Sequence, residues 1–232
     1  MRCRLVPVKH HRLTINMKKY YKIILLLTLS LSACLEKDNT TFVIPPYEVT
    51  IPETIIPSSM IDSLRPYMTI YDGEDPPVIE GGFLASPMEL VHASDIYVNN
   101  NFYNTKLLFS SQSCRNMICY NEEQSSAQLI CDDAIVTGRG SSFTFAGQAE
   151  MHNAVAGWSC VLGLVISGER SSDGTIRRLE YANIMLEKND PYNVLIEVGD
   201  FRVYRDSDGT TTPHSWQPSA STNPVTDNIM KL

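Results

Sequence analysis

The sequence predicts an all-β domain, built as a single antiparallel barrel of about eight strands or, alternatively, as a two-sheet sandwich. Three observations support this prediction. Apolar stretches rich in Val, Ile, Phe and Tyr recur at spacings of roughly 8–12 residues, clusters of Gly, Asn, Asp and Ser separate them, and no long window keeps a helical period. The predicted strands cover residues 78–84, 89–98, 101–111, 117–120, 128–137, 142–151, 158–169, 175–188 and 194–205.

The first residues of the chain are expected to form an export signal. Residues 17–22 (Met-Lys-Lys-Tyr-Tyr-Lys) are basic, and residues 23–31 form an apolar run. A basic start, a short apolar run and small residues before a cleavage point are typical of a secretory signal peptide. The run is shorter than the roughly 20 apolar residues that a membrane span needs. We therefore predict a signal peptide over residues 1–33, in which Met17 is the better start and residues 1–16 come from a mis-set start codon.

The signal ends in Leu31-Ser32-Ala33-Cys34. This tetrapeptide resembles the lipobox of bacterial lipoproteins. The resemblance implies cleavage before Cys34, diacylglycerol on its sulfur and acylation of the new amino group by a chain such as palmitate. Because several acyl chains give stable anchoring, the membrane is the expected partner of Cys34.

Charge limits the other partners. Of the 19 Lys and Arg residues, seven lie within residues 1–33, where there is no acid, so the mature 199 residues carry 12 basic and 26 acidic side chains, a net charge of −14. Such a chain lacks the basic surface that binds nucleic acid. The same charge is repelled by anionic lipid, which leaves membrane attachment to the acyl chains.

A lipidated tether is predicted over residues 34–57. It is rich in proline and has no sustained period, and proline favours an extended backbone. A short helix is expected over residues 58–64, capped by Ser58 or Ser59 and stopped by Pro66.

The β domain itself is predicted to occupy residues 58–209. Residues 210–232 contain three prolines and many Ser and Thr residues, which predicts an irregular tail. Trp158 lies in the longest apolar stretch and is expected in the core, whereas Trp216 is expected to dock the tail on the domain.

Three segments resemble a group of uncharacterised Bacteroidetes envelope lipoproteins. They are residues 76–87 (PPVIEGGFLASP), residues 166–169 (ISGE), and residues 198–209, which run from VGDFRVY into DSDG. The resemblance spans about residues 60–209 and implies an outer-membrane lipoprotein, with no activity attached. The first-strand pattern followed by a β meander is also similar to lipocalin-like barrels.

Four cysteines remain after the lipobox, namely Cys114, Cys119, Cys131 and Cys160. An even number in an exported domain permits two disulfides, with three connectivities. We expect one disulfide among Cys114, Cys119 and Cys131, and a buried small apolar role for Cys160. No Cys-x-x-Cys pair is present, so neither a thioredoxin-like site nor a zinc knuckle is indicated.

The weak metal candidates are Asp206 and Asp208, in a stretch that looks like part of a calcium loop. In the EF-hand register, however, Tyr204 falls at position one and Ser215 at position twelve, where oxygen ligands and a glutamate are needed. We therefore expect a polar turn here, and no cofactor.

Catalytic motifs are not evident. The three histidines of the mature chain lie far apart in sequence, and no Gly-x-Ser-x-Gly elbow occurs. The leading hypothesis is a non-enzymatic, lipid-anchored envelope protein whose β domain binds a small ligand or another envelope component. The alternatives are a glycan- or cell-wall-directed hydrolase and a purely structural or adhesive subunit. A hollow interior of roughly 300–1,000 Å³ favours a ligand carrier, whereas a filled interior leaves only the outer surface for binding.

Overall fold

A computed structural model describes residues 50–96, 104–112, 117–123 and 127–215, with the backbone alone for residues 117–123, 127, 128, 132 and 133. The chain divides into two units, Met1–Pro45 and Pro46–Leu232. All described residues belong to the second unit.

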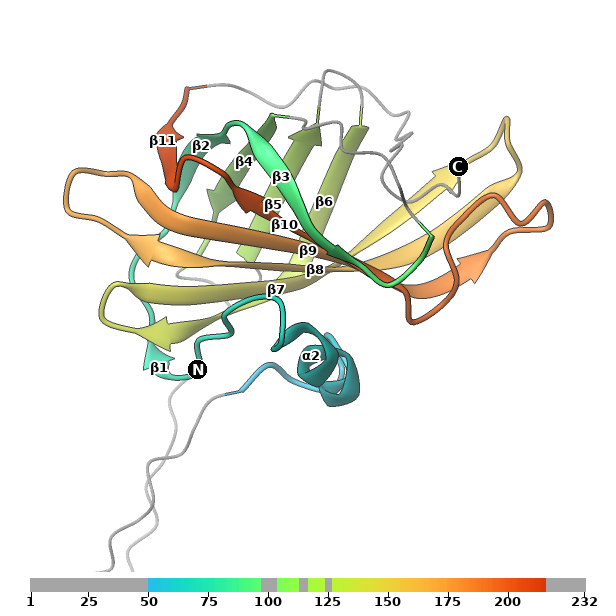
Figure 1. Ribbon diagram of the computed structural model, residues 1–232, viewed down its shortest axis with the longest axis horizontal. Helices are drawn as coiled ribbons and strands as arrows, with labels where there is room; N and C mark the ends of the chain where they lie inside the picture. The colour runs from blue at the N-terminus through green and yellow to red at the C-terminus, as the bar shows by residue number, and fades with distance from the viewer. Residues whose placement is uncertain (1–49, 97–103, 113–116, 124–126, 216–232) are drawn as a thin grey trace, which may run out of the picture. The chain divides into compact units, whose positions relative to one another are not determined.

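The described residues form a helix and eleven strands, which confirms the all-β prediction (Figure 1). The elements are α2 (Ser58–Leu64), β1 (Glu74–Asp75), β2 (Gly81–Ala85), β3 (Met88–Ala93), β4 (Thr105–Ser110), β5 (Met117–Glu123), β6 (Ala127–Arg139), β7 (Ser142–Asn153), β8 (Trp158–Arg170), β9 (Ile176–Asn189), β10 (Phe201–Asp206) and β11 (Thr210–Pro213).

The strands form one sheet in the order β11-β2-β4-β5-β6-β7-β8-β9-β10-β3. From β4 to β10 each strand pairs antiparallel with the next, as in the predicted meander. The exceptions are β3, which crosses over to pair with β10, and β1, which pairs parallel with β6. The short β11 pairs with both β2 and β9, so the sheet curls back on itself there (Figure 1).

The architecture within the all-β class differs from the expectation. The strand order has ends at β11 and β3, so the predicted closed barrel is not confirmed. The two-sheet alternative is not observed either, because the eleven strands belong to a single sheet. Sequence periodicity gives the strands but not their closure, which depends on pairings between strands distant along the chain.

Side chains fill the inner face of the curl. Alternation along β8 puts Leu162, Leu164 and Ile166 on this face. Each buried apolar residue of this core is at most 5 % exposed, and Trp158 lies among them as predicted. The aromatic members are Phe83, Phe109, Phe143, Phe145, Trp158 and Tyr181.

The opposite, outer face is covered by the segment that contains α2 (Figure 1). Ile61 and Leu64 of the helix pack there with Val165, Ile184 and Val203 of the sheet. A seven-residue helix is too short to be stable alone. It therefore depends on this apolar contact.

The helix lies where it was predicted, but its expected cap is wrong. The N-cap position is Pro57, and no side chain of Ser58 or Ser59 caps the helix. Instead, the carboxylate of Glu53 accepts a hydrogen bond from the Ser58 backbone N–H at 3.1 Å. Hydrogen bonds from Ser58 hold the pKa of Glu53 below its usual value.

The expected limits of the β domain shift at both ends. Ile51 and Ile56, assigned to the tether, are buried in the outer-face core. Thr210–Pro213, assigned to the irregular tail, forms β11, because the Asp206–Gly209 turn brings the chain back to β9. Among the described residues, no helix is long and apolar enough to cross a membrane.

Candidate functional site

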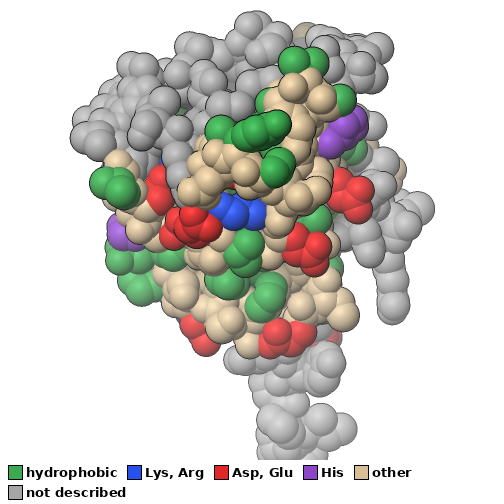
Figure 2. All heavy atoms as spheres, turned by 90° about the vertical axis from the view of Figure 1, so that its right-hand side faces the viewer, with side chains coloured by type: hydrophobic (Ala, Val, Ile, Leu, Met, Phe, Trp, Pro, Cys, Tyr) green, Lys and Arg blue, Asp and Glu red, His purple; other side chains and the backbone are tan. Residues whose placement is uncertain are grey.

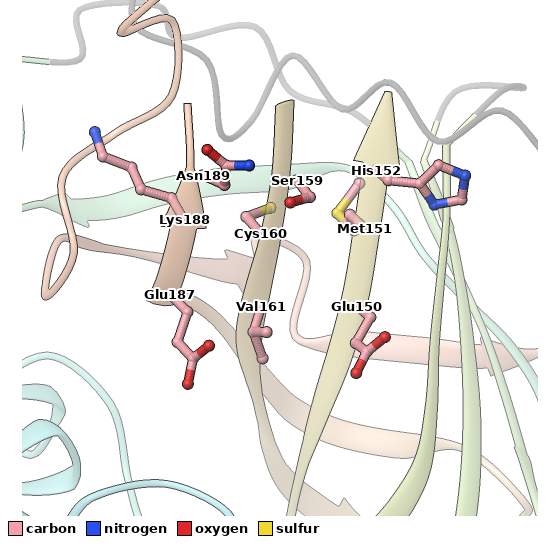
Figure 3. Close-up of a pocket in the computed structure, with 9 residues that line it drawn as sticks. All are labelled: Glu150, Met151, His152, Ser159, Cys160, Val161, Glu187, Lys188 and Asn189. Atoms are coloured by element: carbon pink, nitrogen blue, oxygen red, sulfur yellow. The ribbon is translucent and has the colours of Figure 1, made fainter. Parts of the chain in front are cut away.

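A pocket of about 290 Å³ lies where β7, β8 and β9 end together (Figure 3). Strand register arranges its lining residues in three rows that cross these strands. They are Glu150–Val161–Glu187, Met151–Cys160–Lys188 and His152–Ser159–Asn189.

Alternation puts the middle row on the face opposite to the other two. Met151 and Cys160 accordingly belong to the inner-face core. The glutamate row and the histidine row share the outer face, and residues of all three rows line the pocket. Both polar and apolar residues therefore line the pocket, with Met151 and Cys160 of the inner-face core among them.

The surroundings of Cys160 disfavour its thiolate form. Burial, followed by the charge of Asp190, raises the pKa of its thiol to about 12. Because the thiolate is the reactive form of cysteine, the group stays protonated and unreactive near neutral pH. The structure confirms the prediction that Cys160 is a small buried apolar residue.

The two pocket glutamates do not resemble a glycosidase pair. Glu150 and Glu187 are both exposed and stand on either side of Val161. A glycosidase general acid needs an apolar surrounding that keeps it protonated. Because both glutamates are open to solvent, the pocket gives no support to the hydrolase alternative.

The β9–β10 loop (residues 190–200) is held tightly beside this pocket. Lys188 Nζ lies 2.8 Å from Glu197 Oε2 and 3.4 Å from the Leu195 carbonyl oxygen. The Leu195 N–H donates to Asp190 Oδ2 at 2.7 Å, and Leu195 and Ile196 are buried in the inner-face core. The loop is therefore held by the burial of its apolar side chains in the core and by the polar contacts of Lys188 and Asp190.

The β7–β8 turn (residues 153–157) is also ordered by its own side chain. Asn153 Oδ1 accepts the N–H groups of Val155 at 3.1 Å and Ala156 at 2.9 Å. Gly157, with φ +73°, closes the turn by donating to the Asn153 carbonyl. These bonds leave Val155 at the tip.

Apolar side chains project into solvent from these two loops and from the end of β3. Val155 is 100 % exposed, Ile96 94 %, Tyr192 73 % and Val198 54 %. A Cβ at Gly157 would lie 3.5 Å from the Tyr192 ring, which joins the β7–β8 turn to the β9–β10 loop.

The end of β3 adjoins the same loop. The Ser94 N–H donates to the Phe201 carbonyl, and its hydroxyl donates to Asp200 Oδ1 at 3.1 Å. We call residues 94–96, 153–157 and 190–200, together with the pocket, the loop end. Figure 2 faces this end and shows apolar side chains gathered with acidic ones around a small basic area.

Asp206 and Asp208, the metal candidates predicted from the sequence, accept hydrogen bonds at the turn between β10 and β11. The Thr210 N–H donates to Asp208 Oδ1 at 2.8 Å, and the Thr211 hydroxyl donates to Asp206 Oδ2 at 2.5 Å. Burial raises the pKa of Asp206 above its usual value, although the Thr211 hydrogen bond opposes the shift. Within the described residues, no three His, Cys, Asp or Glu side chains gather in a way that could hold a metal ion.

Two of the three cysteines predicted for a disulfide are placed. Cys119 on β5 lies directly opposite Cys131 on β6. Cys34, Cys114 and Trp216 lie outside the described residues. His92 stacks on Tyr67 with ring centroids 3.6 Å apart. His152, near the end of β7, lines the pocket.

Sequence reasoning missed the loop end as a site. Val155 and Tyr192 stand among polar and turn-forming residues, so they carry no periodic signal. Val198 and Ile96 were assigned to the predicted strands 194–205 and 89–98, but the structure places them in the segments outside β10 and β3. An apolar residue between two predicted strands, such as Val155 between the strands 142–151 and 158–169, is the one cue that could have indicated the site.

Comparison of the chain with protein-family models, with curated proteins and with solved structures found no match in any of the three.

Proposed function

We propose that this chain is a lipid-anchored protein of the cell envelope whose β domain binds another envelope protein through the loop end. Export, cleavage and lipidation of Cys34 are carried over from the signal-like residues 1–33 and the lipobox. The observation that carries the binding proposal is the set of four exposed apolar side chains on neighbouring loops of one sheet end.

The filled inner face argues for this function over that of a ligand carrier. A carrier needs a hollow of several hundred Å³ between its strands. In the described residues that space is taken by buried side chains, including Phe83, Phe109 and Trp158. We propose that the barrel nevertheless closes in solution through β11, because β2, β4 to β9 and β11 form a circuit of pairings. A closed sheet around these side chains is a filled scaffold.

The loop end has the character of a protein-binding surface. Tyrosine is enriched at the centres of interfaces, and loops already held in place lose little conformational entropy on binding. Exposed Glu150 and Glu187 line the adjoining pocket, and exposed Glu197 lies in the β9–β10 loop, where it pairs with Lys188. The complementary partner is a protein surface with apolar residues flanked by Lys or Arg.

A crosslinking experiment in cells tests the binding proposal. A photo-crosslinking residue is placed at Val155 or, as a control, at Val78, which is 68 % exposed in the connection between β1 and β2. We expect one discrete crosslinked protein from position 155, none from position 78, and loss of the product in the Tyr192→Ser variant. The same pattern from both positions, or no product from position 155, contradicts the binding proposal.

The anchor is tested separately. Incorporation of a palmitate analogue and recovery in the membrane fraction should both be lost in Cys34→Ser. If Cys34→Ser still incorporates the analogue and stays in the membrane fraction, the lipidation proposal is wrong, whatever the crosslinking shows.

A further inference from the structure

The β5–β6 hairpin pairs two cysteines across its strands. Cys119 and Cys131 are Cα partners in the antiparallel register, which is irregular between Met117 and Cys119 and regular from Cys119 to Glu123. Directly opposed residues in such a pair have Cα atoms about 4.5 or 5.5 Å apart, depending on the hydrogen-bonding position. Both values fall within the roughly 4.4–6.8 Å that a disulfide spans.

The surroundings of Cys131 are built to its size. Cys131 is fully buried in the inner-face core. On the neighbouring β7, a Cβ at Gly147 would lie 2.9 Å from the Cys131 Cβ and 3.3 Å from its Sγ. Because real Cβ atoms essentially never approach so closely, Gly147 leaves the space that Cys131 occupies.

Cys160 has different neighbours. It lies on β8, opposite Met151 of β7 and Lys188 of β9. Its register therefore places no cysteine across from it, in contrast to Cys131.

We propose that Cys119 and Cys131 form a disulfide that staples β5 to β6. The inference rests on the proposed export for its oxidising compartment, whereas the register is independent of export. One thiolate attacks the disulfide of a thiol–disulfide exchange protein or of oxidised glutathione and forms a mixed disulfide. The second thiolate then displaces the remaining sulfur. Two electrons and two protons leave the cysteines and reside on the oxidant as two thiols.

The bond is expected to stabilise the folded chain. It closes the short loop between Cys119 and Cys131. A disulfide across a loop of this length is expected to raise the Tm of a domain of this size by roughly 5–10 °C. Reduction should remove that increase.

Peptide mapping of the full chain tests the pairing. The purified protein is equilibrated with oxidised glutathione, alkylated and digested with trypsin and Glu-C. Cleavage after Arg115 and after Glu122 or Glu123 puts Cys114, Cys119 and Cys131 on three peptides. We expect a linked Cys119–Cys131 peptide pair, about 2 Da lighter than the two reduced peptides. Linkage of Cys114 to either cysteine, or alkylation of both Cys119 and Cys131, overturns the proposal.

Variants give a second readout. Reductant should lower the Tm of the wild type and of Cys160→Ser alike, and leave the Tm of Cys119→Ser unchanged. A similar fall in Cys119→Ser contradicts the staple. Alkylation of the cysteines in intact cells distinguishes this proposal from the proposed function. If the disulfide forms in vitro but the cysteines are reduced in cells, the result contradicts export. It does not contradict the Cys119–Cys131 pairing.

Discussion

Arg202 forms a buried ion pair that connects two segments distant in the sequence. Its side chain is 1 % exposed, and it forms a two-pronged ion pair with Asp95, which is 11 % exposed. The pair joins β10 to the segment just after β3. Buried pairs of this kind contribute little net stability, but breaking one is costly because a charge is left buried.

Asp95→Asn is therefore expected to destabilise the protein by about 3 kcal/mol. The same two strands offer a matched control, since Glu89 on β3 pairs with Arg205 on β10 in an exposed position. Glu89→Gln should cost less than about 1 kcal/mol. Urea unfolding of the two variants makes the comparison, and equal losses would show that burial of the Arg202 pair is not decisive.

Asp206 gives a pH-dependent prediction. Burial raises its pKa in the folded state, so between the unfolded and folded pKa values the folded chain binds more protons than the unfolded chain. Stability from this group is present at low pH and is lost as pH rises through the folded pKa. Asp206→Asn should remove this dependence and become more stable relative to the wild type as pH rises from about 3 to 7.

The control for Asp206 is Asp173, an exposed turn residue. Hydrogen bonds from Thr175 lower the pKa of Asp173, so its contribution has the opposite sign and is lost as pH falls. Thermal unfolding of Asp206→Asn and Asp173→Asn across this pH range should show trends in opposite directions. Parallel trends would contradict the assignment for Asp206.

At the scale of the element, α2 depends on its apolar contact with the outer face of the sheet. Leu64 is fully buried against the outer face of the sheet, whereas Ser63 beside it is exposed. Leu64→Ala should cost about 2–5 kcal/mol through lost burial and the cavity it leaves. Ser63→Ala should stay within about 0.5 kcal/mol. Chemical unfolding followed by circular dichroism measures both, and a small effect at Leu64 would mean that the helix is not integral to the domain.

Elements were also the scale at which the sequence was most informative. The stretches 158–169 and 175–188 predicted β8 and β9 to within a residue or two, because alternation and turn residues are local signals. Only the second half of the predicted strand 194–205 became β10, since the buried Leu195 and Ile196 serve the loop that precedes it. Burial in a loop and burial in a strand look alike in sequence.

Long-range pairings were beyond local patterns. Nothing in Met88–Ala93 indicates that this strand pairs with β10 and not with the preceding β2. Similarly, the four residues of β11 are too few and too polar to be distinguished from a tail. The loop end was missed for the same reason, because only the pairing of β8 with β9, of β9 with β10 and of β10 with β3 brings its three segments together.

For the whole molecule, the question is what keeps the sheet curled around its filled core. The short β11 is the link, since Thr210 and Thr211 pair with β9 and Thr212 and Pro213 pair with β2. The buried Thr211 hydroxyl donates to Asp206 and so ties this link to the end of β10. A strand of four residues thus connects regions of the sheet that are far apart in strand order.

Truncation after Gly209 should release the curl. Without β11 the facing edges of β2 and β9 lose their partners, and amide hydrogen exchange there should rise while exchange at the centre of β8 stays slow. Truncation after Ser215 keeps β11 and is the control, expected to leave exchange in β2 and β9 unchanged. If both truncations exchange alike, β11 does not hold the sheet, and the proposed barrel closure fails with it. If exchange in β2 and β9 rises only in the shorter chain, β11 is required to keep the sheet curled. The scaffold that carries the loop end then depends on its last strand.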